Sequence, residues 1–349
     1  MKVETGIPFD MKAIPAAVEK LERLGYDGVI MPEVGHDPLL PLAIAAEHSE
    51  RVTLGSAVMI AFPRAPMTVA QAAWDLQKFS GGRFILGLGS QVKGHNVRRY
   101  QTHWNTPPAP RMRDYVSCIR AIWDSWQNGA RPDFHSENYD YTLMTPNFNP
   151  GPLDVPVPRV MISAVNPYMA KVAGEVCDGI RLHGFNTMKY ARAELMPKIE
   201  AGLKKAGKSR ADFEVSGGGF IATGANQSEL EQNIEGVRRQ LSFYGSTRTY
   251  QSVMDAHGWG DITTQLNSMS IQGKWDEMPK LVSDDMVEEF AAVGTYDKIP
   301  GEIQKKFGGD VDSIGFGIPV RNPDDEERAK ELIAAIHEIP TPMKQAVPA

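Results

Sequence analysis

The chain has 349 residues, 42% of them hydrophobic, and a formal net charge of −6 at pH 7. Because binding to a phosphate backbone needs clustered cations, the lack of a basic excess or a Lys/Arg run argues against a nucleic-acid partner. No apolar run approaches the roughly 18 residues of a membrane-spanning helix, and the chain begins with a strand pattern instead of a signal peptide. We therefore expect a cytoplasmic protein with no membrane partner.

Short apolar stretches alternate with amphipathic helical patterns along the chain. Strands are predicted, in order, at Lys2–Gly6, Gly28–Met31, Val52–Val58, Phe84–Leu88, Val160–Ala164, Gly179–Leu182, Phe213–Thr223 and Ser313–Gly317. Helix starts are predicted at capping sequences, namely Asp37-Pro38, Thr68 with Gln71, Asn166-Pro167, Ser228 with Glu231, and Asn322-Pro323. A further helix is predicted at Arg113–Asn128. The alternation is interrupted near residues 129–158 and 249–292, which we interpret as insertions at a barrel rim.

Eight strands that alternate with helices predict a parallel sheet closed into a (β/α)8 barrel. We therefore expect one decorated barrel domain over residues 1–349. The main alternative, an open doubly wound sheet, usually carries a glycine fingerprint after its first strand. Here that strand ends in Gly6-Ile7-Pro8, which does not fit the fingerprint.

Titratable side chains follow several predicted strands, at the end where barrels of this kind place their reactive groups. Glu33 and His36 follow the second strand, His95 the fourth and His183 the sixth. We expect these four residues to converge on one rim, where a histidine or Glu33 could move a proton. For each residue a purely structural role is the alternative, such as a hydrogen bond within its loop.

Two other kinds of chemistry lack their motifs. Metal-dependent barrel hydrolases usually carry an H-x-H pair on the first strand, and this chain has neither that pair nor an H-x-x-x-H pair. There is also no G-x-S-x-G nucleophile sequence. We interpret the two cysteines, Cys118 and Cys177, as buried thiols. The sequence therefore predicts no metal site and no covalent nucleophile.

Two turns have the character of anion sites. After the fourth strand, Gly87-Leu88-Gly89-Ser90-Gln91 could bring backbone amides and the Ser90 hydroxyl close to an anion. As a G-x-G-x-x-G motif this stretch fails, because Val92 occupies the third glycine position. The helix start at Asn166-Pro167 offers further unpaired N–H donors. Together the two turns favour the phosphate of a bound cofactor. The run Gly217–Gly219 is instead interpreted as a bulge or a close packing contact.

Several segments together are similar to a known family. They are Leu24–Gly28 (LGYDG), Leu54–Val58 (LGSAV), Ser80–Phe84 (SGGRF) leading into Leu86–Ser90 (LGLGS), Arg111–Tyr115 (RMRDY), Ala173–Gly179 (AGEVCDG) and Phe243–Thr247 (FYGST). With them the sequence resembles the luciferase-like monooxygenase superfamily, and within it the branch of oxidoreductases that depend on coenzyme F420, a deazaflavin. The resemblance covers nearly the whole chain and implies an interrupted (β/α)8 barrel that is often a homodimer.

The resemblance also implies where a cofactor would lie. It assigns the phosphate to Ser90, Gln91 and the backbone of Val165 and Asn166, and it assigns the hydroxyl of the deazaflavin ring to Glu33. A non-prolyl cis peptide is implied between Ala57 and Val58, behind the ring. The full predicted cofactor set is Glu33, Ala57, Val58, Gly89, Ser90, Gln91, Ser163, Val165 and Asn166.

The sugar-phosphate dehydrogenases of this branch carry two pocket residues that this chain lacks. They have a histidine where this chain has Val34 and a glutamate where it has Val92. The resemblance therefore does not extend to the sugar-phosphate reaction.

The predicted function is hydride transfer between carbon 5 of coenzyme F420 and a small organic substrate, with His36, His95, His183 or Glu33 handling the proton. One alternative is a monooxygenase that uses reduced FMN and needs oxygen and a partner reductase. Another is a protein that binds a flavin or deazaflavin without turnover, and a metal-dependent hydrolase is the third.

Overall fold

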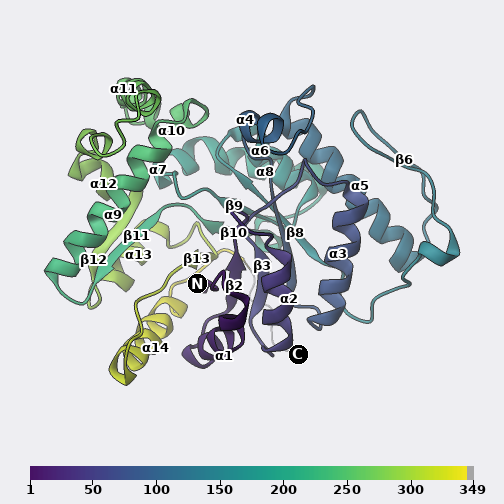
Figure 1. Ribbon diagram of the computed structural model, residues 1–349, viewed down its shortest axis with the longest axis horizontal. Helices are drawn as coiled ribbons and strands as arrows, with labels where there is room; N and C mark the ends of the chain where they lie inside the picture. Colours follow the sequence, from purple (N-terminus) through teal and green to yellow (C-terminus); the bar gives the residue numbers. More distant parts are fainter. Residues whose placement is uncertain (344–349) are drawn as a thin grey trace.

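The computed structural model describes residues 1–343 and has a closed barrel at its centre (Figure 1). Within this range the barrel strands are β1 (Lys2–Gly6), β2 (Gly28–Met31), β3 (Thr53–Ser56) continued by β4 (Met59–Ile60), β5 (Phe84–Gly89), β8 (Arg159–Ala164), β9 (Gly179–Leu182), β10 (Glu214–Gly217) and β13 (Ser313–Gly315). They pair in the order β3-β2-β1-β13-β10-β9-β8-β5, and β3 also pairs with β5, which closes the ring. All the barrel pairings are parallel. The predicted (β/α)8 barrel is confirmed.

Helices surround this ring and bury its outer face (Figure 1). The longer ones are α1 (Ile14–Leu24), α2 (Leu39–Glu47), α3 (Pro66–Phe79), α5 (Pro108–Asn128), α6 (Pro167–Val176), α8 (Met196–Ala206), α9 (Gln227–Gly245), α11 (Gly260–Ile271), α13 (Ile299–Phe307) and α14 (Pro323–His337). The shorter ones are α4 (Lys93–Arg98), α7 (Met188–Tyr190), α10 (Gln251–Asp255) and α12 (Asp284–Phe290). Every residue of β5 is buried, as expected for a strand covered by helices on one side and packed side chains on the other. Helix α5 begins before the predicted Arg113, because a proline fits its first turn.

The predicted strand Phe213–Thr223 is wrong as one continuous element. Strand β10 ends at Gly217, and the chain turns at Gly217 and Gly218 with φ angles of 79° and 117°, which glycine adopts without a steric cost. The chain then forms β11 (Phe220–Gly224), which pairs in parallel with β12 (Ala291–Thr295) in a separate two-stranded sheet. Neither β12 nor the helix α13 that follows it was predicted from the sequence.

Two predicted helix caps are also wrong. Thr68 does not cap α3, because its hydroxyl donates to the carbonyl of Ala65, the residue that precedes the helix. Helix α9 is capped by Asn226 instead of Ser228, since the Asn226 side chain accepts a hydrogen bond of 3.0 Å from the amide of Glu229. A polar residue followed three positions later by Glu or Gln is therefore too common a pattern to locate these two helix starts.

The other predicted helix starts lie where expected. Asn322 caps α14 by accepting a hydrogen bond of 2.9 Å from the amide of Asp325. The Asp37 carboxylate accepts one of 2.8 Å from the amide of Leu39, the first residue of α2. Asn166 precedes α6, but its side chain makes no capping hydrogen bond.

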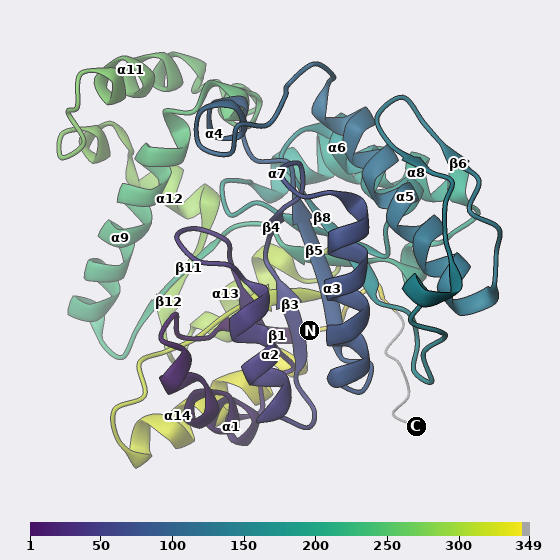
Figure 2. The ribbon, with the colours of Figure 1, turned by 45° about the vertical axis from the view of Figure 1, so that its right-hand side comes forward.

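The two interruptions lie on opposite sides of the barrel, with the β6 region on one side and α11 on the other (Figures 1 and 2). The segment 129–158, which contains β6 (Phe134–His135) and β7 (Asp140–Tyr141), runs along the outside of the helices that follow β3 and β5. Asn138 donates to Asp114 of α5 at 2.8 Å, and Trp74 of α3 donates to the carbonyl of Gly151 at 3.3 Å. This segment covers helices, so its expected position at the rim is wrong. By contrast, the segment 249–292 reaches the mouth of the barrel, since Thr249 and Tyr250 line the cavity described below.

Candidate cofactor and substrate cavity

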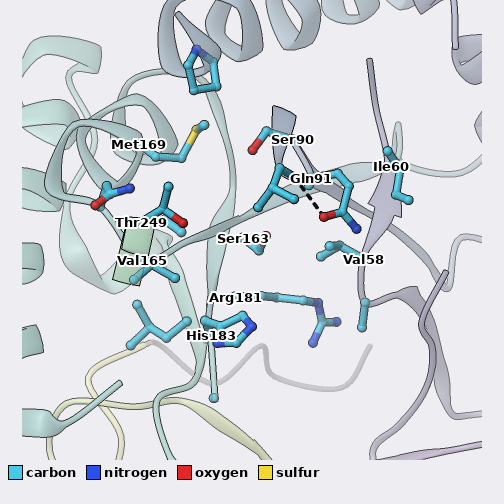
Figure 3. Close-up of a pocket in the computed structure, with 18 of the residues that line it drawn as sticks. Val58, Ile60, Ser90, Gln91, Ser163, Val165, Met169, Arg181, His183 and Thr249 are labelled. Atoms are coloured by element: carbon cyan, nitrogen blue, oxygen red, sulfur yellow. Dashed lines mark hydrogen bonds between the residues drawn. The ribbon is translucent and has the colours of Figure 1, made fainter. Parts of the chain in front are cut away.

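A cavity of about 850 Å³ opens at the carboxyl ends of the barrel strands (Figure 3). Side chains from β1, β2, β5, β8, β9 and β10, or from the residues directly after them, form its wall. All nine residues predicted to bind a cofactor line it, namely Glu33, Ala57, Val58, Gly89, Ser90, Gln91, Ser163, Val165 and Asn166. The structure thus brings the nine residues together, while their role in binding stays a prediction.

One wall of the cavity is a bulge between β3 and β4. The chain advances four positions from Gly55 to Met59 while its partner β5 advances three, from Ile85 to Leu88. The extra residue interrupts the pairing, as in a β-bulge. The peptide bond between Ala57 and Val58 is cis, as the sequence comparison implied, and both residues face the cavity.

The glycines of β5 are needed where the strand packs against this bulge. A Cβ atom on Gly87 would lie 1.9 Å from the Ser56 carbonyl oxygen, and one on Gly89 would lie 2.6 Å from Cγ2 of Val58. The Gly87 amide donates to the Ser56 hydroxyl at 2.9 Å, so it has no donor left for an anion. The interpretation of Gly87 as part of an anion-binding turn is therefore wrong.

Glu33 is held against the bulge by three donors. Its carboxylate accepts hydrogen bonds from the Ile60 amide at 2.8 Å, from the Arg64 guanidinium at 2.8 and 3.1 Å, and from the Tyr100 hydroxyl at 3.3 Å. Only 6% of the Glu33 side chain is exposed. Arg64 also pairs with Asp37 at 3.0 Å, which ties the loop after β2 to the loop after β4. This carboxylate is fixed in one orientation at the cavity wall.

Unpaired donors gather at another part of the cavity. Among residues 1–343, the hydroxyls of Ser90 and Ser163 have no hydrogen-bond partner. Nearby, α6 begins after Asn166, and the amides of Tyr168 and Met169 belong to its first turn, where no intrahelical acceptor exists. Hydroxyls, free amides and a helix N-terminus suit an anionic group such as a phosphate.

A buried ion pair that the sequence analysis missed forms the floor. Arg181 from β9 and Glu4 from β1 point into the barrel, and their closest atoms are 2.6 Å apart. The guanidinium also donates to the Ser216 hydroxyl at 3.2 Å, but its Nε atom is buried without a partner in the described part of the chain. Burial disfavours its charge, yet Glu4 outweighs this and keeps the pKa of Arg181 above its usual value. The sequence signal that could have revealed this pair is a charged residue inside each of two otherwise apolar strands.

Of the three histidines expected at the rim, the structure places only His183 in the cavity wall. His183 directly follows β9, and burial lowers its pKa to about 4. His36 is exposed and packs on Phe9, with ring centroids 5.3 Å apart. His95 is exposed on α4 and does not line the cavity. Of the four residues expected at one site, the cavity wall therefore contains Glu33 and His183 but neither His36 nor His95.

A largely apolar wall, which was not predicted from the sequence, completes the cavity. It comes from the segment between α4 and α5 and from the first turns of α5 and α6, and it consists of Trp104, Pro107, Pro108, Ala109, Pro110 and Met169. These residues lie in a connecting segment and at helix starts, away from the strand ends, so the strand-end rule could not find them.

The two cysteines are buried, as predicted, and burial raises the pKa of Cys118 to about 11. Within residues 1–343, no group of three or more His, Cys, Asp or Glu side chains is arranged to hold a metal ion. Among the described helices, none combines the length and the apolar character needed to cross a bilayer.

Fold and cavity together define a (β/α)8 barrel with a cavity at the carboxyl ends of its strands. The chain belongs to the luciferase-like monooxygenase family, whose profile matches residues 2–311. A protein of Mycobacterium tuberculosis called uncharacterised is 42% identical over 314 residues, which cover 90% of this chain and 92% of that protein. The 5,10-methylenetetrahydromethanopterin reductase of Archaeoglobus fulgidus is 26% identical over 297 residues and 84% of each chain.

Solved structures show the same fold. The coenzyme F420-dependent tetrahydromethanopterin reductase of Methanopyrus kandleri superposes with a TM-score of 0.75 at 19% identity, covering 97% of this chain and 98% of that one. The oxygenating constituent of 3,6-diketocamphane monooxygenase of Pseudomonas putida, in complex with FMN, gives a TM-score of 0.65 at 14% identity, covering 99% and 100%.

Proposed function

We propose that this protein is an oxidoreductase that transfers a hydride between coenzyme F420 and a small organic substrate. The observation that carries the proposal is that all nine predicted cofactor positions line one cavity at the barrel mouth. The similarity to a methylenetetrahydromethanopterin reductase and to a coenzyme F420-dependent fold supports it.

The residues of the cavity fit such a cofactor. When bound, a deazaflavin supplies a carbon that accepts or donates hydride. Ser90, Ser163 and the first-turn amides of α6 would hold its phosphate, because these donors have no partners of their own in the described chain. Glu33 would orient the ring, since its carboxylate is already fixed against the bulge. The apolar wall would exclude water from the reacting atoms.

A fluorescence titration of the purified apoprotein with coenzyme F420, and separately with FMN, tests this proposal. We expect saturable F420 binding that is much tighter than FMN binding. Ser90→Ala should weaken F420 binding about tenfold, the effect of losing one hydrogen bond to a charged group. Ser228→Ala, on the exposed start of α9, is the matched control and should leave binding unchanged. Binding of neither cofactor would refute the proposal.

A reduced-FMN monooxygenase is the second candidate, because the donors around Ser90 would receive the phosphate of FMN equally well and a similar fold binds FMN. It would need oxygen and a partner reductase to supply the reduced flavin. FMN preference in the titration, followed by oxygen consumption with reduced FMN, would favour it. Tight cofactor binding without turnover on a broad substrate panel would instead favour a binding protein.

A further inference from the structure

The apolar wall of the cavity includes a segment without secondary structure. Residues 101–107, between α4 and α5, form neither helix nor strand, and they bring Trp104 and Pro107 into the wall. A hydrogen bond of 2.8 Å from the Thr102 amide to the Asn96 carbonyl joins the beginning of this segment to α4. Because fixing the backbone of one residue costs about 1–2 kcal/mol of conformational entropy, further contacts must hold the rest in place.

Arg111, in the first turn of α5, joins this segment to its surroundings. Its Nη1 atom donates a hydrogen bond of 2.8 Å to the His103 carbonyl, and its Nε atom donates one of 3.0 Å to the Tyr139 hydroxyl. The guanidinium also lies 4.4 Å from the centre of the Phe62 ring, a cation–π contact. Phe62 in turn packs edge-on against Trp104, with ring centroids 5.9 Å apart. Arg111 forms no salt bridge within residues 1–343, so these contacts determine where it lies.

The turn between β6 and β7 forms the other side of this joint, and its hairpin lies against α5 (Figures 1 and 2). Asn138 accepts a hydrogen bond of 2.7 Å from the Thr106 hydroxyl and donates one of 2.8 Å to the Asp114 carboxylate of α5. The Ser136 hydroxyl closes the turn, because it donates to the Tyr139 carbonyl at 2.8 Å and accepts from the Tyr139 amide at 3.0 Å. The turn is therefore a rigid support.

The wall segment is thus held at two points, one on either side of Trp104. One is the hydroxyl of Thr106, which donates to the turn, and the other is the carbonyl of His103, which accepts from Arg111. Trp104 lies between these points and lines the cavity, whereas neither Arg111 nor Tyr139 does. Contacts outside the cavity therefore decide where the Trp104 ring lies inside it.

We infer that a brace formed by Arg111, Asn138 and Tyr139 sets the size of the apolar molecule that the cavity accepts. These three are positioning residues, because they hold the wall segment and do not line the cavity. Without the brace the wall would move outward, so a small ligand would lose contacts with it and a larger one would fit. The inference rests on the proposed function in treating this ligand as the substrate, but the brace itself does not depend on the cofactor.

Two variants of the same hairpin test this inference on the protein loaded with F420. Tyr139→Phe deletes the hydroxyl that accepts from Arg111, whereas the matched control Tyr141→Phe deletes a buried hydroxyl that has no partner in the described chain. Calorimetry measures the dissociation constants of benzene and naphthalene, which differ in size and carry no reacting group. In Tyr139→Phe the ratio of the naphthalene constant to the benzene constant should fall about fivefold, the worth of one hydrogen bond. An unchanged ratio, or an equal fall in Tyr141→Phe, would overturn the inference.

A second measurement needs no cofactor. In apoprotein labelled with fluorotryptophan, the fluorine resonance of Trp104, assigned with Trp104→Phe, should be single in the parent and in Tyr141→Phe. It should broaden or split in Tyr139→Phe and in Thr106→Val, which releases the other point of the segment and serves if Tyr139→Phe does not fold. A single, unshifted resonance in these variants would overturn the inference. Loss of F420 binding with a split Trp104 resonance would refute the proposed function alone, whereas F420 binding with an unaffected Trp104 would refute this inference alone.

Discussion

Replacing Glu4 by leucine is the sharpest test of the cavity floor. The side chains of Glu4 and Arg181 are 5% and 8% exposed, so Glu4→Leu would leave a buried guanidinium with only the Ser216 hydroxyl as a partner. Removing one member of a buried ion pair costs about 3–5 kcal/mol, because the other charge stays desolvated. Since 349 residues unfold with an entropy of about 0.7 kcal/mol/K, the melting temperature should fall by about 4–7 °C.

The assay is thermal unfolding followed by circular dichroism, with the double variant Glu4→Leu/Arg181→Met as its partner. The double variant removes both charges and keeps apolar volume, so it should be more stable than Glu4→Leu alone. A melting temperature of Glu4→Leu within about 1 °C of the parent would refute the reasoning, because a loss of even about 1 kcal/mol would lower the melting temperature by more than this. A double variant less stable than Glu4→Leu would refute it as well.

Three further predictions concern the bulge, a buried acid and a helix start. In Gly89→Ala the new Cβ would lie 2.6 Å from Cγ2 of Val58, so the bulge must shift. F420 binding should then weaken about tenfold, and an unchanged fluorescence titration would contradict this prediction. Glu214 is buried, which alone would raise its pKa, but the nearby cations lower it to about 2. The ionised Glu214 carboxylate therefore stabilises the folded protein by up to about 3 kcal/mol at pH values above the unfolded pKa of this group. This stabilisation is lost as the pH falls from about 4.5 towards 2. Denaturant titrations should accordingly show a weaker pH dependence for Glu214→Gln than for the parent. Asn226→Ala should lower the free energy of unfolding by about 1 kcal/mol, and Ser228→Ala should lower it by less than about 0.5 kcal/mol. The reverse order in urea unfolding would indicate that Ser228 caps α9, as predicted from the sequence.

The barrel could be predicted from the sequence because local patterns specify it. Each barrel strand is a short apolar run between helical patterns, and those runs lie within a few residues of the observed strands. The run Phe213–Thr223 has the same local pattern throughout, so nothing in it shows that its second half leaves the barrel. That choice depends on pairing with β12, about 70 residues further on, and a single sequence does not reveal such a pairing.

The site was predicted unevenly for similar reasons. Residues directly after strands, such as Ser90 and His183, lie where the barrel must expose them. His95 also follows a strand, but it lies on the short helix α4, is exposed and does not line the cavity, and that helix was not predicted. The pair of Glu4 and Arg181 joins β1 and β9, two strands that do not pair with each other and lie far apart in the sequence, so neither residue alone reveals its partner.

The small sheet of β11 and β12 has a consequence for how this protein can diversify. Phe220 pairs with Ala291 and Gly224 with Thr295, so the segment 225–290 leaves the end of one strand and returns at the start of its parallel neighbour. This segment is thus attached to the scaffold through two paired strands, and Tyr250 reaches the cavity from it. Exchanging this segment between relatives would alter which molecules are accepted while leaving the strands that carry Ser90 and Ser163 untouched. Substrate selectivity in this fold can therefore evolve, or be engineered, by exchange of this one segment.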